Sequence, residues 1–298
     1  MEETEEKNYV KAGKILHETL EFAQKKVKPG MRMLLAAESI EAKIFELGGK
    51  PAFPVNLSAN NIAAHYTPAI DDETVVGEKD VLKVDAGVHI EGCIADSATT
   101  IDFSGEWGKM LEANEAALRN ALSIVKPGLE IRKIGKEIEE TIRKAGFMPI
   151  QNLSGHTLEK FTVHAGVTIP SIDNNDSREL ESGMAFAIEP FACNGKGYVK
   201  GTNTIEIYEM EARKALRNTF ARQILDFVEK EYGTLPFAER WVVKSIPATQ
   251  RKMALRELVS SGCLKTHPVL REENIVTVSQ FENSVLITED GETIITVK

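Results

Sequence analysis

The sequence predicts an α+β fold made of two similar halves, one of which carries an inserted helical segment. The phrase Val-Lys-Pro-Gly occurs at residues 27–30 and again at 125–128. Two neighbouring runs, VLKVDAGVHI and IADSATTIDF, are typical of a buried β-hairpin. Residues 202–266 contain 11 Lys+Arg and 8 Asp+Glu, whereas the whole chain has a net charge of −9. This stretch therefore reads as a separate module.

The two halves begin with the same helical arrangement. Apolar residues at helical spacing run from Val10 to Ala23 before the first Val-Lys-Pro-Gly, and from Leu111 to Val125 before the second. Pro-Gly ends each helix, and further helices are expected over 33–47 and 131–145. Three matched pairs lie 98, 96 and 99 residues apart, namely Pro29 and Pro127, Asn56 and Asn152, and His65 and His164. An ordered series of this kind indicates a duplication.

The hairpin of the first half carries two aspartates. Period-2 alternation places Asp85 on one face of its strand, opposite the Leu82 and Val84 face, and the tight turn is expected near Glu91-Gly92. If the strands are neighbours, Asp85 and Asp96 project into one cavity.

The duplication predicts a matching pair in the second half. Glu189 lies in MAFAIEPFA and Glu282 in SQFENSVLI, and the material between them interrupts the second hairpin. A pseudo-two-fold axis brings both glutamates in opposite the aspartates. We therefore predict a catalytic domain of residues 1–201 and 267–298, with residues 202–266 as an inserted helical subdomain. Its helices are expected over 209–230, 237–244 and 249–260.

Ionised carboxylates in apolar strands are costly to bury unless a positive charge holds them. Two divalent metal ions balance the four carboxylates, and neutral His156 completes the set. Oxygen ligands with one imidazole suit Co, Mn, Fe or Zn and indicate metal-assisted hydrolysis, with Glu189 shuttling a proton to the leaving group. His65 and His164 lie beside small or polar residues, so they are expected to contact substrate and to donate a hydrogen bond to a developing oxyanion.

Composition excludes several classes of protein. No apolar run approaches the ~20 residues of a membrane span, and the acidic start MEETEEK is unlike a secretory signal. Three widely spaced cysteines favour a reducing, cytoplasmic location. A strongly acidic chain is a poor general binder of nucleic acid, so no specific nucleic acid is expected.

Several motifs together resemble those of a type II methionine aminopeptidase over nearly the whole chain. They are AAHYTP at 63–68, the pair VLKVDAG and IADSATT, SGH followed by VHAG, AFAIEPFA followed by GKG, and the late QFE. The resemblance implies the "pita-bread" fold, a curved antiparallel sheet covered by helices, with a winged-helix-like insertion. It also implies removal of the initiator methionine from nascent polypeptides with a small second residue.

The resemblance assigns roles to individual residues. Asp96 and Glu282 bridge two metal ions, Asp85 chelates one of them, and His156 with Glu189 holds the other. His65 and His164 contact the substrate, and Phe53 forms a wall of the methionine pocket.

The resemblance has two departures. Eukaryotic members associate with ribosomal factors through a long polybasic N-terminal extension, whereas only 64 residues precede His65 here; ribosome association stays open as a partner interaction, and a monomer is expected. His267 stands where eukaryotic members tend to have a tyrosine.

Two alternatives remain. One is an inactive protein of the same fold that binds RNA or ribosomes, which metal analysis would identify. The other is a proline-directed peptidase, which a comparison of Met-Ala-Ser with an Xaa-Pro peptide would reveal.

Overall fold

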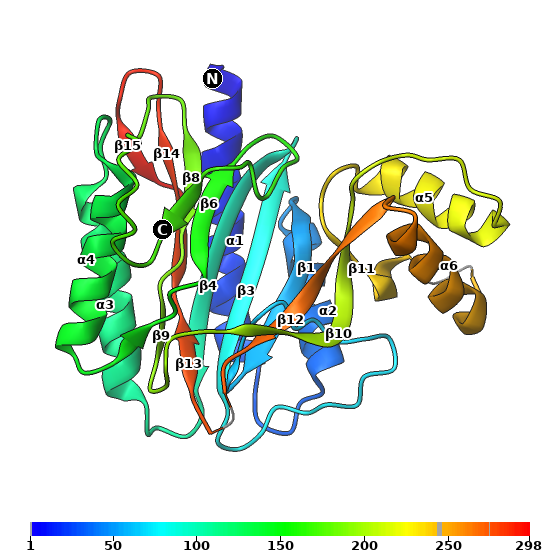
Figure 1. Ribbon diagram of the computed structural model, residues 1–298, viewed down its shortest axis with the longest axis horizontal. Coiled ribbons are helices and arrows are strands. Elements are labelled where there is room, and N and C mark those ends of the chain that lie inside the picture. Colours follow the sequence, from blue (N-terminus) through cyan, green and yellow to red (C-terminus); the bar gives the residue numbers. More distant parts are fainter. Residues whose placement is uncertain (1, 243–245, 274) are drawn as a thin grey trace.

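A computed structural model describes residues 2–242, 246–273 and 275–298 of the chain. One curved antiparallel sheet forms its centre, flanked by helices and joined on one side by the insertion (Figure 1). In spatial order its strands are β1 (Lys50–Ala59), β3 (Val81–Ile90), β4 (Cys93–Asp102), β14 (Glu282–Ile287), β8 (Ala185–Ile188), β6 (Ser154–Leu158) and β7 (Thr168–Pro170), with β15 (Thr293–Ile295) paired to β14.

Two helices cover the first half of the sheet. Helix α1 spans Glu3–Lys26 and α2 spans Met33–Glu46. Their apolar faces share one buried cluster with the sheet face that carries Leu82 and Val84, as the alternation of β3 predicts. Burial at about 25 cal/mol per Å² of apolar area makes this packing, rather than helix propensity, the main stabilising contribution.

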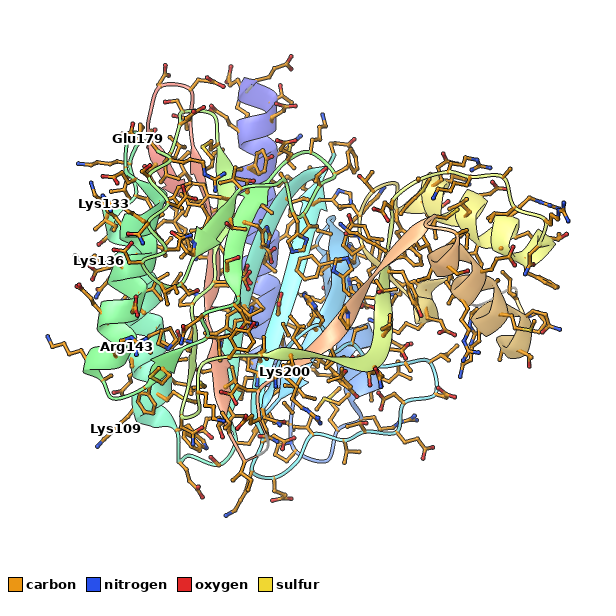
Figure 2. All side chains as sticks on the ribbon, in the orientation of Figure 1. Lys109, Lys133, Lys136, Arg143, Glu179 and Lys200 are labelled. Carbon is orange, nitrogen blue, oxygen red and sulfur yellow. The ribbon has the colours of Figure 1, made fainter. Side chains whose placement is uncertain are left out.

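The second half repeats this arrangement. Helix α3 (Gly108–Ile124) and helix α4 (Ile131–Lys144) pack on each other and on the strands of the second half, around Phe186 and Val285. The exposed side chains of Lys133, Lys136 and Arg143 on α4 point away from the sheet (Figure 2). The order β1-β3-β4 is mirrored by β6-β8-β14, and β4 pairs with β14 at the junction. The predicted duplication and pseudo-two-fold arrangement are therefore present in the fold.

The strands that hold the two glutamates are shorter than the apolar runs suggest. The run around Glu189 forms β8 and then β9 (Phe191–Cys193), and the run around Glu282 forms β13 (Val278–Gln280) and then β14. Strands β13 and β9 join β5 (Met148–Pro149) in a small second sheet. Each glutamate thus lies where the chain passes between a strand of the large sheet and a strand of the small one.

The insertion has its own core and is less helical than its sequence predicts. Its strands β10 (Lys200–Met210), β11 (Phe237–Ala238) and β12 (Leu264–Arg271) form a sheet with β2 (Ile62–Ala64). Two helices, α5 (Thr219–Glu231) and α6 (Ala248–Ser260), pack on it around Leu225 and Leu255. The domain boundaries themselves remain a prediction, and residues 202 and 266 both fall within strands.

Two of the three predicted insertion helices need correction. The helix predicted over 209–230 begins only at Thr219, because residues up to Met210 pair with β12 and Asn218 caps the helix with its side chain. The helix predicted over 237–244 is instead β11 followed by a 3₁₀ turn, η1 (Glu239–Trp241), and residues 243–244 lie outside the described residues. The helix predicted over 249–260 is α6.

Among the described residues, every helix is too short or too polar to cross a bilayer.

Candidate metal centre

The hairpin of the first half places its two aspartates on one face. Strands β3 and β4 are joined by the two-residue turn Glu91-Gly92, and both residues have positive φ (50° and 90°), the geometry that suits a two-residue hairpin. Asp85 stands opposite Ala98, and Asp96 stands opposite Gly87. The two aspartates are thus diagonal neighbours across the pair, as the alternation predicts.

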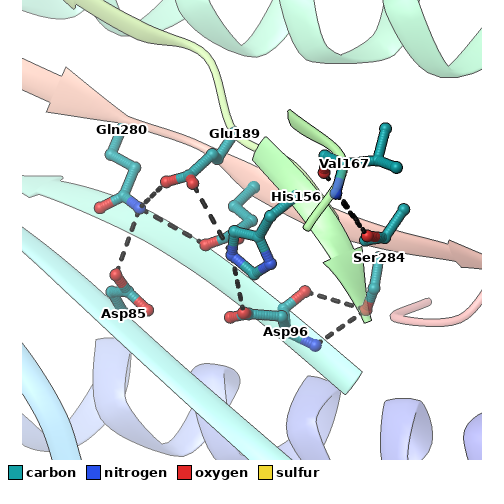
Figure 3. A network of polar contacts seen from close by, with 9 residues as sticks. Asp85, Asp96, His156, Val167, Glu189, Gln280 and Ser284 are labelled. Atoms are coloured by element: carbon teal, nitrogen blue, oxygen red, sulfur yellow. Dashed lines mark hydrogen bonds and ion pairs between the residues drawn. The ribbon is translucent and has the colours of Figure 1, made fainter. Parts of the chain in front are cut away.

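The second half contributes three further side chains, and Figure 3 shows two of them, Glu189 and His156, gathered with Asp85 and Asp96. Glu282 begins β14 and stands opposite Ala98 of β4. Glu189 follows β8 directly, and His156 lies in β6. The Nε2 atom of His156 lies 3.7 Å from Oδ2 of Asp96 and 3.9 Å from Oε1 of Glu189. All five predicted ligand residues therefore line one cleft.

Hydrogen bonds between strands fix the two halves at this point. The backbone N–H of Asp96 donates to Oγ of Ser284 at 2.8 Å, and that hydroxyl donates back to the carbonyl oxygen of Asp96 at 3.0 Å. The hydroxyl of Ser97 donates to the carbonyl oxygen of Glu282 at 2.5 Å. Ligands held by a rigid sheet can be placed accurately.

The four carboxyl groups strongly perturb one another. Burial raises the pKa of Asp85 to about 7. Burial, and then the charge of Asp85, raises the pKa of Asp96 well above its usual value. Burial and the neighbouring carboxylates do the same to Glu189 and Glu282. Without a cation, burial and the mutual repulsion of these groups therefore favour their protonated forms.

Gln280 is a member of the site that the sequence analysis missed. Its side-chain nitrogen lies 3.3 Å from Oδ2 of Asp85, 3.4 Å from Oε2 of Glu189 and 3.4 Å from Oε2 of Glu282 (Figure 3). A signal existed in the sequence, because Gln280 precedes Glu282 by two residues and period-2 alternation places both on one face. An uncharged amide offers two N–H groups to three carboxylates, so it leaves the charge of the cluster unbalanced.

The donor set fits a divalent metal. One oxygen or nitrogen atom each of Asp96, His156 and Glu282 lies within 4.8 Å of the other two. Oδ1 of Asp85 and Oδ1 of Asp96 are buried and make no hydrogen bond to the described residues. Buried carboxylate oxygens without donors are costly, and a cation would satisfy them. Burial lowers the pKa of His156 to about 4, so its ring is neutral and able to bind a metal.

The predicted substrate residues line the same cleft, whose empty space, counted together with the open solvent at its entrance, is about 490 Å³. Phe53 is buried in its wall, and its ring lies over Gly87: a Cβ atom on Gly87 would stand 2.3 Å from Cε1 of Phe53. His65 and His164 also line the cleft, and His164 is exposed to solvent. Glycine is thus required at position 87 by the close approach of the pocket wall.

The insertion also contributes to the cleft through Ile207 and Pro236, which the sequence analysis did not predict. His267 on β12 lines the cleft too, at the position where the resemblance implies a tyrosine near the pocket in eukaryotic members. The His267 ring packs edge-on to His65 at a centroid distance of 5.6 Å and stacks on His164 at 6.0 Å. Nε2 of His267 donates to Oε2 of Glu209 at 3.0 Å. Strand register alone brings these residues in, so no local sequence signal marks them.

Comparisons with known proteins agree with this geometry. Residues 7–289 match metallopeptidase family M24. A methionine aminopeptidase of Pyrococcus horikoshii is 47% identical over 288 residues, which cover 96% of this chain and 98% of that protein.

Two solved structures share the fold. A thermophilic Arx1 superposes with a TM-score of 0.87 at 18% identity, covering 99% of this chain and 91% of that one. A methionine aminopeptidase of Thermotoga maritima superposes with a TM-score of 0.73 at 21% identity, covering 100% and 98%. At these identities the structural likeness concerns the fold alone.

Proposed function

Because the chain belongs to metallopeptidase family M24, and within it to the archaeal-type methionine aminopeptidases, we propose that its cleft binds two divalent metal ions. The chain is a metal-dependent hydrolase that removes methionine from the N-terminus of polypeptides. The observation that carries the two-metal proposal is the charge of the cleft, where three buried carboxyl groups, the partly buried Glu189 and one neutral imidazole meet. Two dications balance four carboxylates.

We assign the ligands as the duplicated strands suggest. Asp96 and Glu282 lie at the junction of the two halves and would bridge the ions. Asp85 would complete one site, and His156 with Glu189 would complete the other. Ions bound there would supply Lewis acidity and lower the pKa of a water molecule. The identity of the metal is a proposal limited to Co, Mn, Fe or Zn by the ligand chemistry.

The contacts of His65 refine its expected role. Burial lowers the pKa of His65 to about 4, so the ring is neutral at physiological pH. Its Nδ1 lies 3.2 Å from the carbonyl oxygen of Pro268, which can only accept, so Nδ1 carries the proton. Nε2 is then an acceptor, suited to an N–H group of the substrate. The expected hydrogen bond to a developing oxyanion is left to His164, and Glu189 is the proton shuttle.

The shape of the cleft supports the side-chain preference. Phe53, Val163 and Ile207 give it apolar walls, which suit an unbranched thioether side chain. A tight site beyond the scissile bond would favour a small second residue.

The cellular setting belongs to the same proposal. Three buried free cysteines, Cys93, Cys193 and Cys263, fit a reducing cytoplasm. Nascent polypeptide N-termini are the substrates in that setting. Action as a monomer and contact with the ribosome remain predictions, the latter motivated by the net positive charge of residues 202–266.

The test compares two peptides while the metal is titrated. Purified protein freed of metal is given Co, Mn, Fe or Zn in steps, and release of methionine from Met-Ala-Ser is measured beside cleavage of an Xaa-Pro peptide. We expect methionine release to rise until two equivalents are bound. Saturation of both binding and activity at one equivalent would refute the second ion, and equal cleavage of the Xaa-Pro peptide would refute the assigned specificity.

A further inference from the structure

His65 has an unusual backbone conformation. Its φ is 66°, in the left-handed region that residues with a side chain rarely adopt. Such a conformation costs free energy and persists only where neighbouring contacts hold it. The segment after β2 that carries His65 is therefore fixed by groups around it.

Val55 lies beside this segment in an irregular part of β1. The register of β1 against β3 shifts between Phe53 and Asn56, so Val55 falls at a bulge. Both of its backbone groups are satisfied by side chains. Its N–H donates to Oε1 of Glu41 at 3.2 Å, and its carbonyl oxygen accepts from the hydroxyl of Thr67 at 2.8 Å. The hydrogen bond from Thr67 thus connects the bulge at Val55 to the segment that carries His65.

Arg240 of the insertion links these groups. Its Nη1 donates to Oγ1 of Thr67 at 2.8 Å, and its Nη2 forms an ion pair with Glu41. Trp241 donates from Nε1 to the second carboxylate oxygen of Glu41 at 3.0 Å. Glu41 and Arg240 are each 7% exposed, and Thr67 is 1% exposed. The two Nη atoms of Arg240 thus contact two different buried partners, and this arrangement fixes the orientation of the guanidinium group relative to both of them.

We propose that Thr67 and Arg240 are positioning residues for His65, so that the insertion holds part of the catalytic site in place. The hydroxyl of Thr67 connects the guanidinium of Arg240 to the carbonyl of Val55, and His65 stands two residues before Thr67. The same contacts hold the stretch of β1 between Phe53 and Asn56, both of which line the cleft. The functional part of this inference rests on the proposed role of His65.

A simpler alternative is that the cluster only docks the insertion. The chain offers a matched control, because a second buried ion pair joins Arg251 to Glu239 at 2.6 Å between two elements of the insertion itself. Weakening that pair should loosen the insertion close to Arg240, since Glu239 precedes Arg240 in η1, while the hydrogen bond between Arg240 and Thr67 itself keeps both partners.

The experiment uses four variants of the zinc-loaded enzyme. Thr67→Val removes the hydroxyl and keeps the volume, Thr67→Ser keeps the hydroxyl, and Arg240→Lys keeps the charge but loses the fork. Arg251→Lys is the control. Metal content, Tm, and kcat and KM for Met-Ala-Ser are measured, together with the ring C–H signal of His65 in a ¹H–¹³C NMR spectrum, assigned with His65→Ala.

We expect Thr67→Val and Arg240→Lys to lower kcat roughly tenfold, the effect of one lost hydrogen bond, with KM and metal content nearly unchanged and the His65 signal moved. Thr67→Ser should restore both readouts, and Arg251→Lys should lower Tm while leaving the His65 signal in place. An unmoved His65 signal in Thr67→Val would overturn the inference. If the signal moves but His65→Ala retains full turnover, the positioning stands and the proposed role of His65 fails instead.

Discussion

Replacing one of the two carboxylates that we propose as bridging ligands tests the charge balance of the metal centre most directly. Asp96→Asn keeps the shape of the side chain and removes its ability to ionise. Burial, and then the charge of Asp85, raises the pKa of Asp96 well above its usual range, so in the metal-free protein the charged form of this carboxyl group is unfavourable. The substitution should therefore change the stability of the metal-free protein little, or increase it.

The metal-loaded protein should behave in the opposite way. A ligand that is present at 100 times its Kd stabilises the folded state by about 2.7 kcal/mol. For a chain of 298 residues this corresponds to a rise in Tm of roughly 5 °C. Asp96→Asn removes one anionic bridge from two cations, so we expect most of this rise to disappear together with the bound metal.

The assay is a thermal melt with and without added metal, beside elemental analysis of dialysed protein. Asp102→Asn on the same strand is the control: burial raises the pKa of Asp102, but hydrogen bonds from Ser104, Trp107 and Gly105 outweigh it and lower that pKa overall. The control should lower Tm in both states equally and keep the metal. If Asp96→Asn binds two equivalents and shows the full rise in Tm, the carboxylate is not a bridging ligand.

Three further outcomes can be measured. His65→Ala and His164→Ala should each lower kcat roughly 100-fold while elemental analysis finds the metal retained; lost metal would mean that these residues act as ligands. Gly87→Ala should raise KM for Met-Ala-Ser roughly tenfold, because the new methyl group displaces the ring of Phe53, and an unchanged KM would remove Phe53 from the pocket. The gain in Tm on adding metal should grow from about pH 6 to about pH 8. Carboxyl groups whose folded pKa is raised, such as Asp85 at about 7, stabilise the metal-free fold at low pH, and this contribution is lost as the pH rises. A gain in Tm that shrinks as the pH rises would contradict this reasoning.

Most of the fold could be predicted because its signals are local. Helical spacing and Pro-Gly gave the positions of α1 to α4, although α1 begins at Glu3, seven residues before the Val10 that opens its apolar pattern. Alternation gave the β3–β4 hairpin. The insertion was harder. Residues 209–218 have good helix formers, yet the first of them pair with β12, and tertiary pairing outweighs differences in propensity of a few tenths of a kcal/mol per residue.

The candidate site divides in the same way. Its five proposed ligands stood out because ionisable residues in apolar strands are unusual. Gln280 was overlooked although alternation points to it. The contact of Arg240 with Glu41 spans 199 residues of sequence, and the approach of His267 to His65 depends on how the insertion strands cross the sheet. Contacts between residues so far apart in the chain produce no periodic pattern in the sequence, so the sequence does not predict them.

The junction between β4 and β14 has a consequence for how the protein matures. Asp85 and Asp96 are synthesised early, whereas Glu282 comes near the end of the chain and reaches the site only when β14 pairs between β4 and β8. An incomplete chain therefore lacks one of the five proposed ligands. Any activity that depends on Glu282 begins only after translation has passed this strand.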